Sequence, residues 1–264
     1  MAKGQIWCRY QADDGASFGL IEDDQVIRVD GTPWGDHSVS ATRHPLDAVR
    51  LLVPVMPGTF YCAGANYRDH IVGRAKMHGR EPKFATRPDI GYRANSALVA
   101  DGEDIVKPAD SSDVFEYEGE LVAVFGKAAR KVSHDEALDC VFGWTIGNDV
   151  SERTWQASDR ANARAKNCDT FKPMGPWMVT DFDADAARTI IRLNGEETDN
   201  FATANMIFSA ADFIVEVSKY ATIHPGDVMW MGTDGMPRAM KPGDSVEVEI
   251  TGIGVLRNNV VAEN

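Results

Sequence analysis

Residues 116–127, EYEGELVAVFGK, place three alternate glutamates directly ahead of a run of strand-forming apolar residues. Successive side chains of a strand point to opposite faces, so Glu116, Glu118 and Glu120 should share one face. The LVAVF run is typical of a strand buried on both faces. Like charges at the start of such a strand raise one another's pKa unless a cation lies between them. We therefore expect a central strand whose glutamates bind a divalent ion; a solvated acidic face is the alternative.

The composition predicts a folded chain whose partners are small molecules or copies of itself. Of its 264 residues, 44% are hydrophobic, which is enough for a sizeable core. A formal net charge of -13 without a basic stripe argues against nucleic acid and anionic membranes as partners. Because the sequence shows no secretory leader and no apolar run of ~20 residues, we expect a cytoplasmic protein. The four cysteines lack the spacing of a zinc site or a disulfide scaffold and are expected to be reduced.

Turns and prolines divide the chain into two predicted units. Residues 5–29 alternate short apolar runs with DDG and EDD turns, which predicts a small antiparallel β-meander. The segment PLDAVRLLV, residues 45–53, predicts a short amphipathic helix before two prolines interrupt the chain. We therefore expect a small N-terminal β domain over residues 1–57 and a larger catalytic domain over residues 58–264.

The catalytic unit is predicted to be rich in strands. Residues 190–198 surround an Asn194-Gly195 pair and predict a β-hairpin. Residues 206–220, MIFSAADFIVEVSKY, have the period of an amphipathic helix capped by Ser209. Strands thus outnumber helices, and the predicted fold class is α+β.

Polar clusters at the ends of two predicted strands supply candidate site residues. The strand in FYCAGANYRDH ends in a loop that carries His70, a possible general base; a surface histidine is the alternative. The basic segment 71–88 that follows is expected to be a mobile lid or an irregular surface loop. The strand in GWTIGND ends at Asp149, a possible ligand or an ordinary turn aspartate. On the next predicted helix, capped by Ser151, two polar residues three positions apart share a face, namely Arg153 and Gln156.

Over residues 59–262 the sequence resembles the fumarylacetoacetate hydrolase superfamily, and in particular its acylpyruvase-like single-chain members. The resemblance is carried by ordered motifs along the chain: GANYRDH, EYEGELVAVFGK, GWTIGNDVSERTWQ, AKNCDTFKPMGPW, RLNGEET, ATANMIF, HPGDVMWMGT and KPGDSVEVEITGIGVLRN. It implies a rolled mixed β-sandwich with a small N-terminal β domain, usually assembled as a homodimer. It also implies Mg²⁺ or Mn²⁺ as the cofactor, with Glu116 left outside the ligand set. The implied site residues are Glu118, Glu120 and Asp149 as metal ligands, His70, Lys166, Arg153 and Gln156 as catalytic residues, and Tyr67, Arg93 and Thr233 as substrate contacts.

The function implied by the resemblance is metal-dependent hydrolysis of a carbon–carbon bond in a 2,4-dioxo acid or related β-diketone, such as an acylpyruvate or a fumarylacetoacetate-like compound. His70 would activate the water, while Lys166 and Arg153 would stabilise a developing enolate. The chain departs from the family pattern at Gly73, where many members carry a glutamate that pairs with the histidine, and at Asp234, where a proline is common. The alternative is decarboxylation, isomerisation or dehydration of a 2-oxo acid through the same enolate chemistry.

Overall fold

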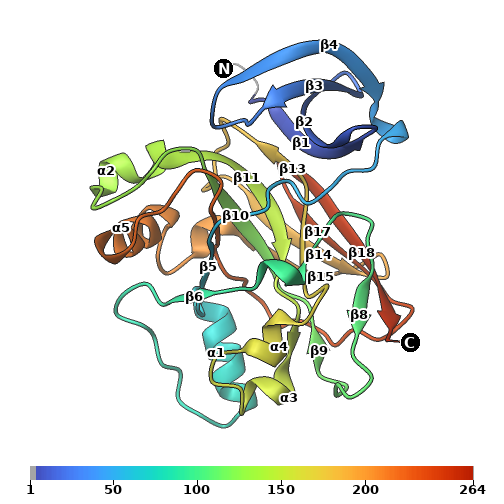
Figure 1. The fold of residues 1–264 in the computed structure, drawn as a ribbon. Coiled ribbons are helices and arrows are strands. Elements are labelled where there is room, and N and C mark those ends of the chain that lie inside the picture. Colours follow the sequence, from blue (N-terminus) through green and yellow to red (C-terminus); the bar gives the residue numbers. More distant parts are fainter. Residues whose placement is uncertain (1–3, 264) are drawn as a thin grey trace.

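The protein is built mainly from two sheets, and separate apolar clusters pack against their faces (Figure 1). The structure, a computed structural model, describes residues 4–263. The larger sheet has the strand order β4-β3-β2-β1-β13-β11-β10-β16-β5-β6, with β7 paired to β13, and the smaller has the order β15-β14-β17-β18-β8. The bounds of the larger sheet are β1 Ile6–Ala12, β2 Gly15–Glu22, β3 Gln25–Gly31, β4 His37–Pro45, β5 Phe60–Ala63, β6 Ile90–Tyr92, β7 Leu98–Val99, β10 Gly119–Phe125, β11 Val141–Asn148, β13 Lys172–Val179 and β16 Val228–Trp230.

The remaining elements form the smaller sheet, a two-stranded pair and the helices. The smaller sheet contains β8 Ile105–Lys107, β14 Arg188–Leu193, β15 Glu196–Ala202, β17 Ser245–Ile250 and β18 Gly254–Ala262, and a two-stranded pair contains β9 Phe115–Glu116 and β12 Ser151–Glu152. The helices are α1 Arg68–Met77, α2 His134–Ala137, α3 Arg153–Gln156, α4 Ala163–Asn167 and α5 Ala210–Tyr220. This architecture confirms the predicted strand-rich α+β class.

Strand β10 lies at the centre of the molecule, and every one of its residues is buried, as the sequence predicts. Its side chains alternate between two apolar clusters. Leu121 and Ala123 join a cluster that contains residues of the smaller sheet and of α5. Val122 and Val124 join a cluster that contains Trp7 and other residues of the N-terminal strands. One strand therefore connects both cores.

The N-terminal meander is present, with β1 to β4 paired antiparallel in order at one end of the molecule (Figure 1). It also continues the larger sheet, because β1 pairs with β13 through Ile6 opposite Val179. The prediction of a helix over residues 45–53 is wrong. Only a 3-10 turn forms at Leu46–Ala48, and the chain then runs extended so that Leu51 bridges Tyr10. The boundary between residues 57 and 58 stays a prediction.

Several predicted elements are confirmed, and three differ. The hairpin β14–β15 forms around Asn194-Gly195, and α5 begins with a capping box between Ser209 and Asp212. The polar residues predicted in a loop instead begin helix α1, and the segment predicted as a lid or irregular loop over residues 71–88 is helical as far as Met77. Lys166 lies on helix α4. The cap of α3 is Glu152 rather than Ser151, because Ser151 and Glu152 form β12 with β9.

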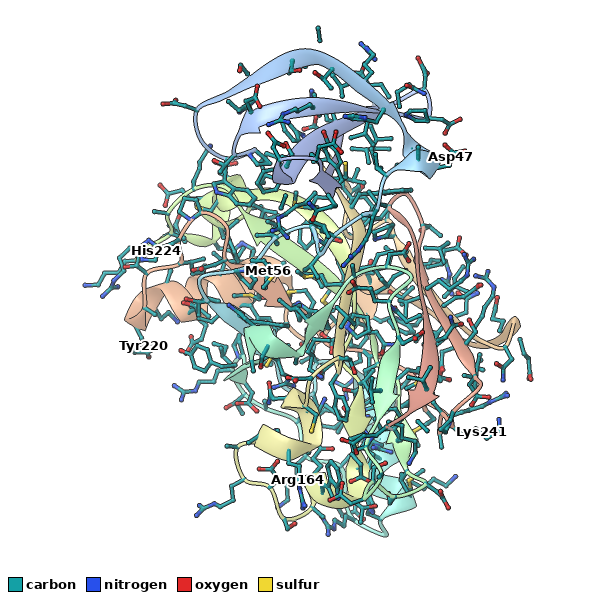
Figure 2. All side chains as sticks on the ribbon, turned by 45° about the vertical axis from the view of Figure 1, so that its right-hand side comes forward. Asp47, Met56, Arg164, Tyr220, His224 and Lys241 are labelled. Atoms are coloured by element: carbon teal, nitrogen blue, oxygen red, sulfur yellow. The ribbon has the colours of Figure 1, made fainter. Side chains whose placement is uncertain are left out.

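Side chains fill the space between the layers, while those of Tyr220 and Lys241 project outward (Figure 2). Within residues 4–263, no helix combines the length and the apolar character needed to cross a membrane.

Candidate active site

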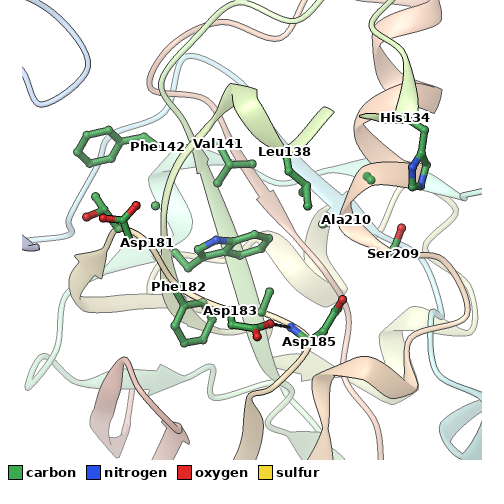
Figure 3. Close-up of a pocket in the computed structure, with 15 residues that line it drawn as sticks. His134, Leu138, Val141, Phe142, Asp181, Phe182, Asp183, Asp185, Ser209 and Ala210 are labelled. Carbon is green, nitrogen blue, oxygen red and sulfur yellow. Dashed lines mark hydrogen bonds between the residues drawn. The ribbon is translucent and has the colours of Figure 1, made fainter. Parts of the chain in front are cut away.

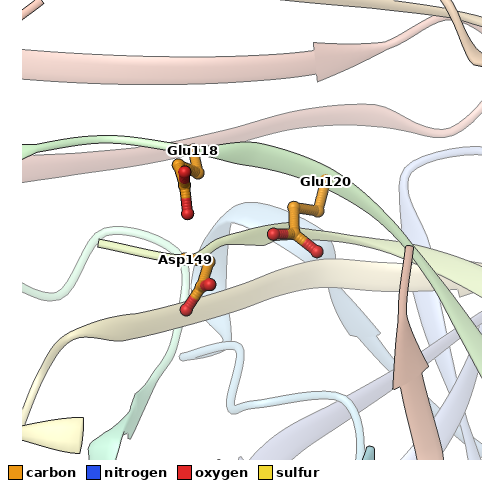
Figure 4. A group of neighbouring side chains, drawn as sticks. All are labelled: Glu118, Glu120 and Asp149. Atoms are coloured by element: carbon orange, nitrogen blue, oxygen red, sulfur yellow. The ribbon is translucent and has the colours of Figure 1, made fainter. Parts of the chain in front are cut away.

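Three buried carboxylates meet where β10 begins and β11 ends (Figure 4). Glu120 belongs to β10, Glu118 directly precedes it, and Asp149 directly follows β11. Antiparallel pairing of Gly119 with Asn148 brings these positions together, and the Asp149 N–H donates to the Glu118 carbonyl at 2.8 Å. One oxygen from each carboxylate lies within 4.8 Å of the others, and the exposed fractions of the three residues are 5% or less.

The environment of Glu120 shows why these acids suit a cation. Its Oε2 accepts the Gly232 N–H at 2.7 Å. Burial, followed by the charges of Asp149 and Glu118, raises the pKa of Glu120 to about 8. A divalent ion held between the three carboxylates would offset this repulsion, and an all-oxygen donor set favours Mg²⁺ or Mn²⁺. The residues present therefore fit the predicted metal site.

Glu116 lies apart from this cluster, although the strand pattern placed it on the same face. Its Oε2 accepts from Arg153 Nε at 2.7 Å and from Arg74 Nη2 at 3.1 Å. The break between β9 and β10 separates its backbone from that of Glu120.

Cationic side chains from four segments of the chain surround the carboxylates. Arg93 contacts both oxygens of Asp149, at 3.0 and 2.8 Å, and Lys166 contacts Asp149 and Glu118. Arg153 donates to Glu118 and, at 3.1 Å, to Gln156. Burial alone would raise the pKa of Asp149, but Arg93, Lys166 and Lys172 together hold it well below its ordinary value. In the same way, Arg153 and Lys166 outweigh burial and lower the pKa of Glu118.

Lys172 is a residue of this cluster that the sequence analysis missed. Its side chain is fully buried, and its Nζ contacts Asp149 Oδ1 at 2.7 Å and the carbonyls of Val150 and Phe171 at 2.9 and 2.8 Å. Burial lowers the pKa of Lys172 to about 8. The signal in the sequence was a lysine at the head of the apolar run KPMGPWMV, where a solvated ammonium is not expected.

His70 lies in the first turn of α1 and faces the carboxylates. Its Nε2 is 3.9 Å from Glu118 Oε1, and its Nδ1 is 2.9 Å from the carbonyl of Gly235. Because a carbonyl can only accept, Nδ1 carries the proton and Nε2 holds the free lone pair. Burial lowers the pKa of His70, which favours this neutral form. Asp234 accepts the His70 backbone N–H at 3.0 Å, so the residue that departs from the family pattern helps to hold the helix.

The position of Gly73 is closed by another side chain. A Cβ built at Gly73 would collide with the Sδ of Met236. The carbonyl of Gly235 orients the His70 ring, as an acidic partner would otherwise do.

The three carboxylates and His70 line one cavity of about 150 Å³, together with the cations Arg93, Arg153 and Lys166. Thr233 and Gln156 also line it, together with Asn162 and the backbone of Gly232. Tyr67 is the predicted site residue that does not line it. Tyr67 is 1% exposed and packs in the core, with its ring 5.3 Å from that of Phe201. The structure therefore brings together nine of the ten predicted site residues: His70, Arg93, Glu118, Glu120, Asp149, Arg153, Gln156, Lys166 and Thr233.

A larger cavity of about 440 Å³ lies elsewhere, between α2, β11 and the start of α5 (Figure 3). Phe142, Phe182 and Leu138 line it, and Asp181 and Asp183 also contribute. It contains none of the three clustered carboxylates. Converging groups with shifted pKa values are a better indicator of an active site than volume, so we assign the chemistry to the smaller cavity.

Comparisons with known proteins show the family to which the chain belongs. A family profile described as "Fumarylacetoacetate (FAA) hydrolase C-terminal" matches residues 59–261, and one described as "Rv2993c-like, N-terminal" matches residues 7–54. Protein Rv2993c of Mycobacterium tuberculosis is 37% identical over 265 residues, which cover 96% of this chain and 97% of that protein. The mitochondrial oxaloacetate tautomerase FAHD2A of Homo sapiens is 36% identical over 232 residues, which cover 82% of this chain and 71% of that protein.

Among solved structures, 5-carboxymethyl-2-hydroxymuconate delta-isomerase from Mycobacterium smegmatis has a TM-score of 0.89 and 32% identity, covering 98% of this chain and all of that one. The match of the first profile covers most of the chain, and protein Rv2993c is similar along nearly its whole length. The chain therefore belongs to the fumarylacetoacetate hydrolase family.

Proposed function

We propose that this enzyme interconverts the keto and enol forms of a small dianionic 2-oxo acid with the help of a divalent ion. The observation that carries the proposal is a buried histidine whose Nδ1 contacts a carbonyl and whose Nε2 faces a cluster of three buried carboxylates. A base and an electrophile on opposite sides of a carbonyl compound are what enolisation requires.

The side chains divide the work as follows. Glu118, Glu120 and Asp149 would hold Mg²⁺ or Mn²⁺, which when bound supplies a Lewis acid for the 2-oxo group. His70 Nε2 takes a proton from the carbon next to that group, and the electrons of the broken C–H bond move to the carbonyl oxygen. A proton from solvent then adds to that oxygen to complete the enol, and His70 releases to solvent the proton that it took from carbon. Lys166 and Arg153 stabilise the negative charge as it develops.

Size and charge support a small, doubly charged substrate. A cavity of about 150 Å³ is below the usual 300–1,000 Å³ of drug-sized ligand sites. The cations Arg93, Arg153, Lys166 and Lys172 already contact the carboxylates, so an added divalent ion leaves excess positive charge for substrate carboxylates. The names of two relatives, an oxaloacetate tautomerase and a delta-isomerase, describe proton shifts of this kind.

Hydrolysis of a carbon–carbon bond in a 2,4-dioxo acid is the second candidate. It is favoured by the family profile and by the free Nε2 of His70, which could equally deprotonate a water molecule. One observation argues against hydrolysis. Many family members pair this histidine with a glutamate, but here that position is Gly73, and the side chain of Met236 occupies the space beside it. Decarboxylation of the same 2-oxo acid would use the same enolate.

The test distinguishes three reactions, namely tautomerisation, hydrolysis and decarboxylation, each measured with Mg²⁺ or Mn²⁺ present and again after chelation. We expect the purified chain to speed the loss of enol absorbance of oxaloacetate without producing pyruvate. Release of pyruvate and a carboxylic acid from an acylpyruvate would instead establish the hydrolase, and release of carbon dioxide from oxaloacetate the decarboxylase.

Substitution of the base gives the first prediction. His70→Gln should lower turnover of the enol by at least about 100-fold, in line with loss of a general base, because glutamine cannot accept a proton. Affinity for Mn²⁺, measured by calorimetry, should stay within about threefold of the parent chain. Unchanged turnover would remove His70 from the mechanism.

The homodimer also stays a prediction, which sedimentation would test.

A further inference from the structure

Helix α1, which carries His70, is held at the site by polar contacts rather than by an apolar face. Its only buried residue is His70 itself, and Val72 and Met77 are 42% and 60% exposed. An amphipathic helix normally docks through an apolar stripe, and α1 has none. The position of His70 therefore depends on the polar groups that contact α1.

Arg74 provides one of these contacts. It lies one turn after His70, at a spacing of four residues, so both side chains point from the same side of α1. Arg74 Nη2 donates to Glu116 Oε2 at 3.1 Å, and both side chains are largely buried, with 17% and 6% exposed. Removing one partner from an ion pair sheltered in this way has a larger effect than at an exposed pair, because the remaining charge loses a partner without regaining water.

Glu116 also contacts the opposite side of the site. The same Oε2 accepts from Arg153 Nε at 2.7 Å. The other two nitrogens of this guanidinium reach Gln156 and Glu118, so all three are in use and its orientation is fixed. One carboxylate oxygen thus joins α1 to α3, which lie at the same end of the molecule in Figure 1.

We propose that Glu116 is a positioning residue. Through its contacts with Arg74 and Arg153, it fixes the position of the base His70 relative to Arg153, which stabilises the developing negative charge. The proposal gives a role to the one glutamate of EYEGE that lies outside the metal cluster. The effect expected on turnover rests on the proposed function, whereas the effect expected on the hydrogen exchange of α1 does not. When the contact on Arg74 is lost, His70 keeps its contacts with Asp234 and Gly235, but the contact that joins α1 to Glu116 is gone.

Arg74→Met removes the contact between α1 and Glu116 and leaves Glu116 paired with Arg153. We expect kcat for the enol of oxaloacetate to fall at least about tenfold, while KM and the dissociation constant for Mn²⁺ stay within about threefold. Arg74→Lys should recover most of kcat, since it restores a cation opposite Glu116. Glu116→Gln weakens both contacts and should lower kcat and raise KM together. Lys76→Met is the control, because it removes the same charge from an exposed position of α1.

Hydrogen exchange of the α1 amides gives a readout that needs no turnover. We expect exchange over residues 68–77 to be at least about tenfold faster in Arg74→Met than in Lys76→Met, with the rest of the chain unchanged. Equal exchange in these two variants would overturn the proposal, whatever the substrate. If the parent chain turns over no 2-oxo acid but exchange still differs, the proposed function fails and the positioning role of Glu116 stands. Loss of kcat without rescue by Arg74→Lys would also overturn it.

Discussion

At the scale of single residues, the site shows how position decides the charge of identical side chains. Glu118 and Glu120 are two residues apart and both buried, yet their pKa values move in opposite directions. Glu118 contacts Arg153 and Lys166, whereas the partner of Glu120 is a backbone N–H. The cations of this site therefore compensate some acids and leave Glu120 for an added ion.

Glu120→Gln tests this reading. The pKa of Glu120 rises from 4.5 to about 8 in the fold, so its ionised form lowers the free energy of unfolding above about pH 4.5, and fully above about pH 8. Glutamine carries no charge and therefore removes this destabilisation. With chelator at pH 8, we expect the Tm of the variant to equal or exceed that of the parent chain, while Mn²⁺ affinity falls at least about tenfold.

The control for this pair of measurements is Glu247→Gln, a change of equal charge on β17, where the carboxylate pairs with Arg257. It should leave Mn²⁺ affinity unchanged. A Glu120→Gln chain that still binds Mn²⁺ as tightly as the parent would remove Glu120 from the ligand set.

Sequence reasoning recovered the residues that belong to local motifs and missed those that reach the site through tertiary contacts. Glu118, Glu120 and Asp149 follow strand patterns, and Arg153 and Gln156 follow helical spacing. Lys172 and the carbonyl of Gly235 act through partners 23 and 165 residues away, and no local pattern reports such contacts.

At the scale of elements, strands were predicted better than helices because their apolar pattern carries the signal. Strand β10 and helix α5 bury regular apolar faces and were recognised from period alone. Helix α1 buries only His70, so its sequence has no helical period and was expected to be a loop. The least predictable element therefore carries the proposed base.

The contact between the two sheets leads to a prediction at Gly119, the first residue of β10. A Cβ at this position would lie 2.8 Å from Val248 Cγ1 and 2.9 Å from Ile191 Cδ1, closer than carbon atoms pack. Gly119→Ala should therefore lower the free energy of unfolding by ~1–3 kcal/mol. Ile191→Val removes one of the colliding atoms, so it should restore part of that loss in the double variant while being mildly destabilising alone. Additive losses in a denaturant titration would contradict this packing.

At the scale of the whole molecule, the N-terminal strands share a core with the strands that carry the site. Trp7 is 3% exposed and belongs to the same apolar cluster as Val122 and Val124 of β10. Its ring meets that of Phe142 on β11 edge to face, with centroids 5.6 Å apart. The meander is thus joined to the rest both by the pairing of β1 with β13 and by side-chain packing.

This shared core predicts that heat unfolds the chain in one cooperative transition, because neither part can lose its packing without exposing the other. Trp7→Ala removes a large buried side chain and should cost ~3–5 kcal/mol, moving that single transition to lower temperature without splitting it. Val39→Ala on β4, where the side chain is 55% exposed, is the control and should change stability by less than about 0.5 kcal/mol. Differential scanning calorimetry measures both. A Trp7→Ala trace with two peaks, of which only the lower moves, would mean that the meander unfolds independently and that the core around Trp7 does not couple it to the site.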